Sequence, residues 1–217
     1  MDYHRLSELF EKVLCSPYTR VEGDGDYTIE KVDNHLYIYF QCSQTLLDWV
    51  NNFDIAVVPY DGMEIPWKCH RGFLKVWSGL KPYIQEQIMD LTIKNITIVG
   101  YSHGAAIAVL AHEYVWYHRP DLRDKGLESY AFGCPRCYWG YGIPRKLQER
   151  WKNFTVIRNN NDVVSYMPPM LFGYTHVGSV HKIAYENTNP LESHHYDNYR
   201  KTLAHLKEAA ASGPETV

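Results

Sequence analysis

The sequence predicts a single α/β domain in which helices cover both faces of a mostly parallel sheet. Strand-like runs rich in β-branched and aromatic residues alternate with segments whose apolar residues recur at helical spacing, as in β-α-β units. The run ITIV at 96–99 leads into GYSHG at 100–104 and then into AAIAVLA at 105–111, so a strand, a tight turn and a helix follow one another. The 217 residues are enough for one such domain with a large core and few for two, so we treat 1–217 as one domain.

An amphipathic helix is expected over 2–14, because Leu6, Leu9, Phe10 and Val13 fall on one face at helical spacing. The elements expected after it are strands at 36–40 and 54–58 with a turn of helix at 46–50 between them, a helix at 80–91, the strand, turn and helix at 96–111, a strand at 127–132, a helix at 144–151, a strand at 154–158, a strand at 177–185 and a helix at 195–211. Residues 212–217 are expected to form a frayed tail.

Charge and hydropathy argue against a nucleic-acid partner and against a transmembrane segment. The formal net charge is −3, from 22 Lys and Arg against 25 Asp and Glu, and no basic cluster occurs, so we expect no nucleic-acid partner. The longest apolar stretch, 96–115, is interrupted by polar and ionisable residues that are costly in a bilayer, so we expect no transmembrane segment. The first residues lack the pattern of a secretory signal, which favours a cytoplasmic or intracellular location.

Five cysteines form an odd set with no framework spacing, as in a reducing compartment. The CPRC segment at 134–137 has the form of half a zinc or redox site, but no second pair of ligands accompanies it. We therefore expect no metal and no cofactor.

Ser102 is the candidate nucleophile. It is the central residue of GYSHG, and a nucleophile elbow needs a residue without a side chain two positions before and two after the serine. The alternative is an ordinary glycine-rich turn between a strand and a helix.

A serine hydroxyl needs a base within hydrogen-bond reach and a third group that orients the base. Asp162 follows the strand at 154–158 in a polar turn, where an orienting carboxylate belongs; the alternative is a residue that only stabilises an Asx turn.

The histidine is harder to choose. His205 lies inside the closing helix, and His176 and His181 belong to or border the last strand. His194 and His195 are expected in a loop before the last helix, from which a general base can reach the end of the sheet, so this pair is preferred.

In the order of its motifs, the chain resembles the class 3 lipases, a fungal lipase-like branch of the α/β hydrolases. The resemblance covers about 36–199. GYSHGAA at 100–106 is similar to the family's GHSLGG-type elbow, CHRGF at 69–73 to V-H-x-G-F, and AFGCPR at 131–136 to T-F-G-x-P-R. NDVVSYMPP at 161–169, followed by GYTH at 173–176, resembles N-D-x-V-x-x-L-P-P…G-Y-x-H and is the most specific of these matches.

The resemblance implies an α/β-hydrolase fold with Ser102 as nucleophile and Asp162 as acid. The family's base precedes an aromatic residue of the last helix. SHHYDNY at 193–199 is similar to that segment, and its alignment on Tyr199 favours His194, with His195 as the alternative.

The same resemblance implies the groups that surround the reacting atoms. The oxyanion-hole donors are the backbone N–H of His103 and Ser43. Ser43 ends FQCS at 40–43, where the family has F-R-G-S/T, so Gln41 and Cys42 replace the usual Arg and Gly. His70 and Tyr101 are the substrate-binding candidates. The stretch 49–67 is either an acyl-binding wall or short lid, or a core strand with its loop.

The predicted function is a cofactor-independent serine carboxylic-ester hydrolase that acts on lipid esters through an acyl-enzyme, with a transient contact with a lipid interface as a further expectation. One alternative is a catalytically silent lipase-like binding module, which the altered Gln41 and Cys42 favour. The other is a thioesterase or acyltransferase that uses the same triad.

Overall fold

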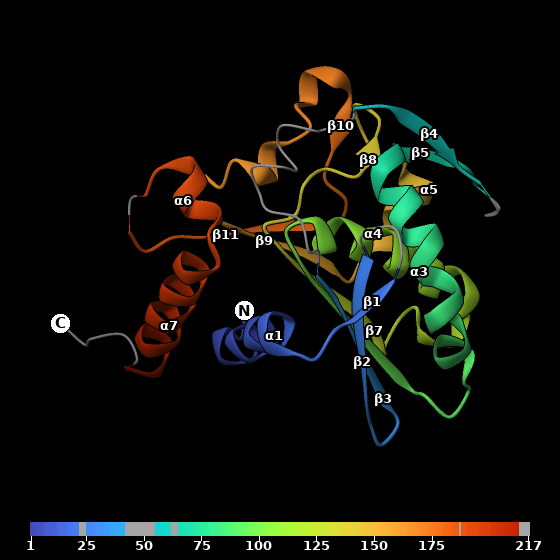
Figure 1. Ribbon diagram of the computed structural model, residues 1–217, viewed down its shortest axis with the longest axis horizontal. Coiled ribbons are helices and arrows are strands. Elements are labelled where there is room, and N and C mark those ends of the chain that lie inside the picture. Colours follow the sequence, from blue (N-terminus) through green and yellow to red (C-terminus); the bar gives the residue numbers. More distant parts are fainter. Residues whose placement is uncertain (22–24, 42–54, 62–64, 187, 213–217) are drawn as a thin grey trace.

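The main sheet forms the centre of the molecule (Figure 1). The computed structural model describes residues 1–21, 25–41, 55–61, 65–186 and 188–212. Within them the strand order is β1-β2-β3-β6-β7-β9-β11; β1, β2 and β3 pair antiparallel, and every pair from β3 to β11 is parallel. The strands are β1 (Thr19–Val21), β2 (Gly25–Val32), β3 (His35–Gln41), β6 (Asn95–Tyr101), β7 (Leu127–Phe132), β9 (Phe154–Asn159) and β11 (Ser179–Ile183).

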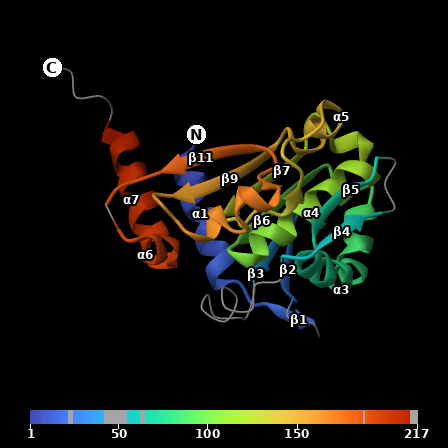
Figure 2. The same cartoon turned by 90° about the horizontal axis from the view of Figure 1, so that it is seen from above.

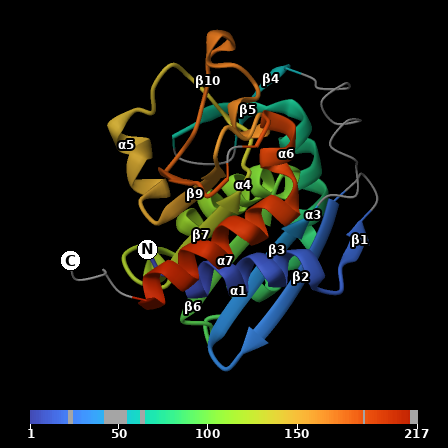
Figure 3. The same cartoon turned by 90° about the vertical axis from the view of Figure 1, so that its left-hand side faces the viewer.

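Helices cover both faces of this sheet, so the predicted fold class is confirmed. Seen from above (Figure 2), α1 (Tyr3–Cys15) and α7 (Tyr196–Ser212) lie on one side, and α3 (Arg71–Met89) and α4 (His103–His118) lie on the other. Figure 3 shows α1 and α7 side by side across the first of these faces. Each face therefore has its own hydrophobic core against the sheet.

The helix α1 occupies nearly the predicted residues. The Asp2 side chain caps it by accepting from the Arg5 amide at 3.1 Å. Its buried residues are the predicted apolar stripe Leu6, Leu9, Phe10 and Val13. This stripe packs against the sheet and α7, where it joins the smaller of the two cores.

A second, antiparallel sheet with the order β10-β8-β5-β4 lies above the main sheet in Figure 1 and was not predicted. Its strands are β4 (Val57–Tyr60), β5 (Trp67–His70), β8 (Tyr138–Trp139) and β10 (Tyr174–Thr175). Strands of two to four residues are too short for alternation of apolar and polar residues to be recognised. The strand expected at 54–58 corresponds to β4, which begins later, and residue 54 lies outside the described residues.

Several element boundaries also differ from the prediction. The helix expected at 80–91 starts at Arg71, because the His70 side chain caps it. The predicted helix at 144–151 is α5 (Arg145–Gln148) followed by a 3-10 turn at Glu149–Trp151. The strand β2 was missed because it carries no apolar run. The expected turn of helix at 46–50 lies outside the described residues, and so do residues 213–217 of the expected tail.

The loop predicted before the closing helix is a helix of its own, α6 (Pro190–His194). Asn189 caps it, since its side-chain oxygen accepts from the amides of Leu191 and Glu192 at 3.1 and 2.9 Å, and Pro190 occupies the first position. Placing His194 in a loop was therefore wrong, because His194 is the last residue of α6.

Candidate active site

Ser102 lies in a turn with an uncommon backbone conformation between β6 and α4. Its φ is 56° and its ψ is −125°, a region that residues with a side chain rarely adopt. A Cβ on Gly100 would lie 2.4 Å from the Gly104 carbonyl oxygen, and a Cβ on Gly104 would lie 2.1 Å from the Phe40 carbonyl oxygen. Both glycines are therefore needed for α4 to approach β3 and β6 as closely as it does.

Two side chains from distant parts of the chain form a hydrogen-bonded line with Ser102. His194 Nε2 lies 2.8 Å from Ser102 Oγ, and His194 Nδ1 lies 2.9 Å from each carboxylate oxygen of Asp162. With its proton on Nδ1, the imidazole donates to Asp162 and accepts from the serine hydroxyl at Nε2. Both Asp162 and His194 are buried, so water does not compete for these bonds.

The Asp162 carboxylate is held by several donors besides His194. Its Oδ1 accepts from the Val164 amide at 2.9 Å, and its Oδ2 accepts from the Tyr199 hydroxyl at 2.7 Å and the Ser165 hydroxyl at 3.4 Å. Burial and the neighbouring Asp162 charge raise the pKa of Tyr199 well above its usual value, so the phenol keeps its proton and donates. Asp162 thus accepts the hydrogen bond of an Asx turn and also lies beside His194, where an orienting carboxylate was predicted.

The absence of a side chain at Gly133 leaves room for Asp162 and His194 to contact each other. It follows β7 with φ 58°, and a Cβ there would lie 2.8 Å from His194 Cε1 and 3.0 Å from Asp162 Oδ2. Sequence reasoning placed Gly133 in the AFGCPR segment but gave it no role. The available signal was a glycine at the carboxyl end of a parallel strand, the edge where sites of α/β folds lie.

His195, the alternative base, points elsewhere. It is exposed, and its Nδ1 lies 3.5 Å from Asp197 Oδ2. Its ring packs against Tyr196 with centroids 4.2 Å apart. The structure therefore brings His194, and not its neighbour, to Ser102.

Tyr101 is half-buried and contacts His194. Its hydroxyl donates to the His194 carbonyl oxygen at 2.5 Å, and its ring stacks on the imidazole with centroids 5.3 Å apart and planes 15° apart. Phe10 of α1 packs edge-on against the same ring at 5.5 Å. Burial raises the pKa of Tyr101, so it remains a donor. This geometry positions His194, and a contact of Tyr101 with substrate stays a prediction.

His70 is buried, and its contact with substrate likewise stays a prediction. Its Nδ1 accepts from the Phe73 amide at 3.4 Å and so caps α3. Its ring stacks on Phe73 with centroids 4.2 Å apart, and Phe73 packs edge-on against the His103 ring at 5.1 Å. The three rings form one wall beside the turn that carries Ser102.

The expected oxyanion-hole donors are described only in part. His103 is the first residue of α4, so its amide lies at a helix N-terminus, where partial positive charge favours an anion. Gln41 ends β3, and its amide nitrogen would lie 2.9 Å from a Cβ on Gly104. Ser43 and Cys42 lie outside the described residues, as do 49–54 of the stretch expected to line an acyl site.

The other histidine and cysteine candidates have structural partners. His176 Nε2 donates to the Ser165 carbonyl oxygen at 2.7 Å, and burial lowers the pKa of His176 to about 4, so it stays neutral. Cys134 and Cys137 are free, buried thiols, and burial raises the pKa of both, which makes them unreactive. In the described ranges, no group of three or more His, Cys, Asp or Glu side chains could hold a metal ion, and no helix is long and apolar enough to cross a bilayer.

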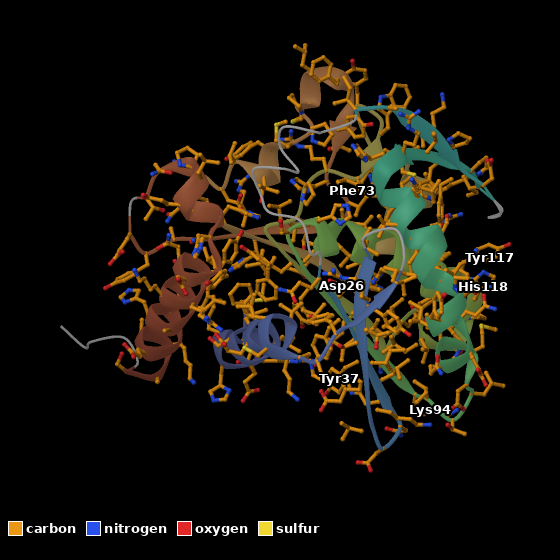
Figure 4. The ribbon with its side chains drawn as sticks, viewed as in Figure 1. Asp26, Tyr37, Phe73, Lys94, Tyr117 and His118 are labelled. Carbon is orange, nitrogen blue, oxygen red and sulfur yellow. The ribbon has the colours of Figure 1, made fainter. Side chains whose placement is uncertain are left out.

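The site lies at the carboxyl edge of the parallel strands. Lys94, directly before β6, is at the foot of the molecule in Figure 4, whereas Phe73, whose ring contacts His103, is in its upper part. Strand β6 therefore runs upward to Ser102, and Asp162 follows β9 at the same edge. This arrangement of strands, turn and hydrogen-bonded residues is that of an α/β hydrolase.

The model of the family Lipase (class 3) matches residues 37–172. This chain therefore belongs to the class 3 lipase family, as its motifs predicted.

Relatives of known name support the same family. The chain is 27% identical over 164 residues to a lipase of Rhizomucor miehei, covering 72% of this chain and 42% of the relative. It is 30% identical over 183 residues to a lipase of Rhizopus oryzae, covering 76% and 43%. It is also 30% identical over 166 residues to phospholipase A1-II 4 of Oryza sativa subsp. japonica, covering 61% and 39%. The chain thus spans less than half the length of these curated relatives.

Solved structures agree on the fold. The Rhizomucor miehei triacylglyceride lipase superposes with a TM-score of 0.65 at 22% identity, covering 77% of this chain and 65% of that one. Lipase II from Rhizopus niveus superposes with a TM-score of 0.67 at 20% identity, covering 80% and 67%.

Proposed function

We propose that the protein is a serine carboxylic-ester hydrolase that acts on lipid esters. The observation that carries the proposal is the unbroken line of hydrogen bonds from Ser102 Oγ through both ring nitrogens of His194 to Asp162. Its relatives are named lipases and a phospholipase A1, which supports a lipid ester as the substrate class. A solved triacylglycerol lipase of this fold is described as having a serine-protease triad as its catalytic centre.

In the proposed reaction, Ser102 Oγ attacks the acyl carbonyl carbon while His194 Nε2 takes the hydroxyl proton. The tetrahedral oxyanion is held by the backbone N–H of His103 and by Ser43, the expected second donor. Collapse breaks the ester bond, and the imidazolium gives its proton to the leaving alcohol.

Water then attacks the acyl-enzyme with His194 again as base, which releases the carboxylic acid and restores Ser102. Asp162 keeps the proton on Nδ1 throughout and stabilises the imidazolium that forms twice in each cycle. These steps need no metal and no cofactor.

The proposal is tested by turnover of p-nitrophenyl esters from acetate to palmitate. We expect wild type to release nitrophenolate, with the dependence on chain length separating an esterase from a lipase. A Ser102→Ala variant should lose about 10⁴-fold or more in kcat. If wild type hydrolyses none of these esters, nor a phospholipid or a thioester, the hydrolase proposal fails and the catalytically silent binding module replaces it. The replacement of the family's Arg and Gly by Gln41 and Cys42 favours that alternative.

Transfer of the acyl group to an added alcohol would show up in the same assay. If wild type forms a new ester faster than free acid, the acyltransferase alternative replaces the hydrolase. Preference for a thioester over the matching oxygen ester would favour a thioesterase.

A further inference from the structure

Four apolar side chains project into solvent at the end of the molecule that carries the site. They are Tyr141, which is 81% exposed, and the residues of the 3-10 turn Met170–Phe172, of which Leu171 is 82% and Met170 57% exposed. We call these four residues the apolar tip. In Figure 1 the turn is the orange coil beside β10, at the top of the view. Ordered protein surfaces rarely hold apolar side chains this exposed side by side without a partner.

The carbonyl groups of the segment 167–173, which carries three of the four tip residues, are all hydrogen-bonded within the protein. Every carbonyl oxygen from Met167 to Gly173 accepts a hydrogen bond from within the protein, at 2.6 to 3.4 Å. Arg136 donates to the carbonyls of Met167 and Pro168, through its amide and Nη1. The amides of Phe172 and Gly173 donate to the carbonyls of Pro169 and Met170. The last three carbonyls, of Leu171, Phe172 and Gly173, accept from the Tyr141 hydroxyl, Trp139 Nε1 and the Gly140 amide.

This bonding lowers the cost of moving the tip from water into lipid. An unbonded carbonyl in a hydrocarbon environment costs several kcal/mol, so irregular backbone is normally kept out of lipid. Five of these seven bonds come from side chains or amides of 136–141 and the other two from the amides of Phe172 and Gly173, so each carbonyl oxygen of 167–173 has a partner within the protein. The segment can therefore leave water without losing a carbonyl hydrogen bond.

Cationic side chains pack on the aromatic rings behind the tip. Segments 137–143 and 163–176 contain no Asp, Glu, Lys or Arg. The charged groups that pack on their aromatic rings are Lys68, whose Nζ lies 4.9 Å from the Trp139 ring, and Arg136 and Arg158, whose guanidinium carbons lie 5.8 and 4.8 Å from the Tyr166 ring. An apolar tip with Trp and Tyr behind it and cations at their level matches the layering of a lipid surface with anionic headgroups.

We propose that the apolar tip inserts into the surface of an anionic lipid aggregate and so places the carboxyl edge of the sheet, with Ser102, against that surface. The inference rests on the proposed function, because a lipid ester is met at such a surface. The link to the site is short: Asp162 is eight residues before Met170, and the intervening residues Val164 and Ser165 both donate to its carboxylate. Docking through the tip therefore needs no change at the site.

The test measures binding apart from turnover. The full chain with Ser102→Ala, which cannot degrade lipid, is floated with vesicles of phosphatidylcholine and phosphatidylglycerol. Adding Leu171→Asp should weaken the partition onto these vesicles by about tenfold or more. Adding Leu91→Asp, which changes a 68% exposed leucine beyond α3 at the opposite end of the molecule, should change it by less than about twofold. Met170→Asp should act like Leu171→Asp.

Three outcomes overturn the proposal: equal binding by the Leu171→Asp and Leu91→Asp proteins, equal binding to vesicles of phosphatidylcholine alone, or a dimer of the starting protein that Leu171→Asp dissociates. The last result would assign the tip to a contact between copies.

A second arm separates this proposal from the function itself. In the protein with Ser102 intact, Leu171→Asp should leave turnover of the soluble ester p-nitrophenyl acetate within about twofold of wild type. If wild type turns over no soluble ester while vesicle binding still depends on Leu171, the proposed function fails and the docking surface stands. Melting temperatures within a few degrees of one another confirm that each variant is folded.

Discussion

Ser102 is positioned from the α3 and α4 side of the main sheet by main-chain geometry, whereas Asp162 and His194 are positioned from the α1 and α7 side by side chains. On the first side, two glycines let α4 pack directly onto β3 and β6, and the serine sits in the turn that results. On the second side, a cluster of Phe10, Tyr101, Phe132 and Tyr199 surrounds the acid and the base. The nucleophile thus depends on local chain geometry, and the other two residues depend on long-range packing and hydroxyl groups.

The largest expected effect distinguishes the two adjacent histidines on the second side. His194→Ala should lower kcat for p-nitrophenyl butyrate by about 10³- to 10⁴-fold, because it removes the base. His195→Ala, the matched control, should lower it by less than about threefold, since that ring is exposed and contacts Asp197 and Tyr196. Comparable losses in both variants would contradict the assignment of the base.

On the first side, Gly104→Ala should reduce the free energy of unfolding by about 3 kcal/mol and abolish most of the turnover. Its Cβ would meet the Phe40 carbonyl oxygen and force α4 away from β3, which displaces Ser102. Gly142→Ala is the matched control, because a Cβ there has no atom within 4 Å, and it should stay within about 0.5 kcal/mol of wild type. Urea unfolding measures both, and equal stabilities would show that the close approach is not needed.

A third prediction concerns pH and the core beneath α4. Burial lowers the pKa of His112 to about 3, while its value in the unfolded chain is near 6.5, so the unfolded chain binds the proton first as pH falls. The stability that neutral His112 contributes is thus complete above about pH 6.5 and declines below it, by about 2 kcal/mol at pH 5.

A His112→Gln variant lacks this proton linkage. Its deficit in free energy of unfolding relative to wild type should therefore shrink by about 2 kcal/mol between pH 7 and pH 5. Urea unfolding at both pH values measures the deficit. Parallel stabilities at the two pH values would mean that His112 does not remain neutral in the folded protein.

The smallest expected effect tests the hydroxyl groups on the second side. Tyr101→Phe keeps the ring against Phe10 and the imidazole but removes the bond to the His194 carbonyl oxygen, so kcat should fall by about tenfold while KM changes little. Tyr83→Phe, which changes an exposed tyrosine of α3, is the control for loss of a hydroxyl. A change in KM alone would instead support the substrate contact first expected of Tyr101.

The same contrast explains what could be predicted from the sequence. The turn at Ser102 is a local pattern: glycines at fixed offsets between an apolar strand and an apolar helix are visible within a dozen residues. Asp162 was likewise placed by the strand before it. These features required no knowledge of the tertiary packing.

The second side was harder to predict because its contacts join residues far apart in sequence. Tyr101 and Tyr199 reach His194 and Asp162 across 93 and 37 residues, and no local pattern indicates such pairings. His194 was preferred to His195 only through alignment on Tyr199, and its position on α6 was missed because a five-residue helix has too little periodicity to detect. The ring contacts of His70 with Tyr174 and of Tyr101 with His194 were not predicted for the same reason, because they join residues far apart in sequence.

The proposed reaction requires that Ser102 is the nucleophile and that His194 activates it. The most direct measurement is labelling of the intact protein with a fluorophosphonate probe, followed by peptide mass spectrometry to locate the adduct. We expect one adduct, on Ser102, that is absent in Ser102→Ala and forms about 10³-fold more slowly in His194→Ala. An adduct on another residue, or equal labelling rates in wild type and His194→Ala, would contradict the proposed reaction.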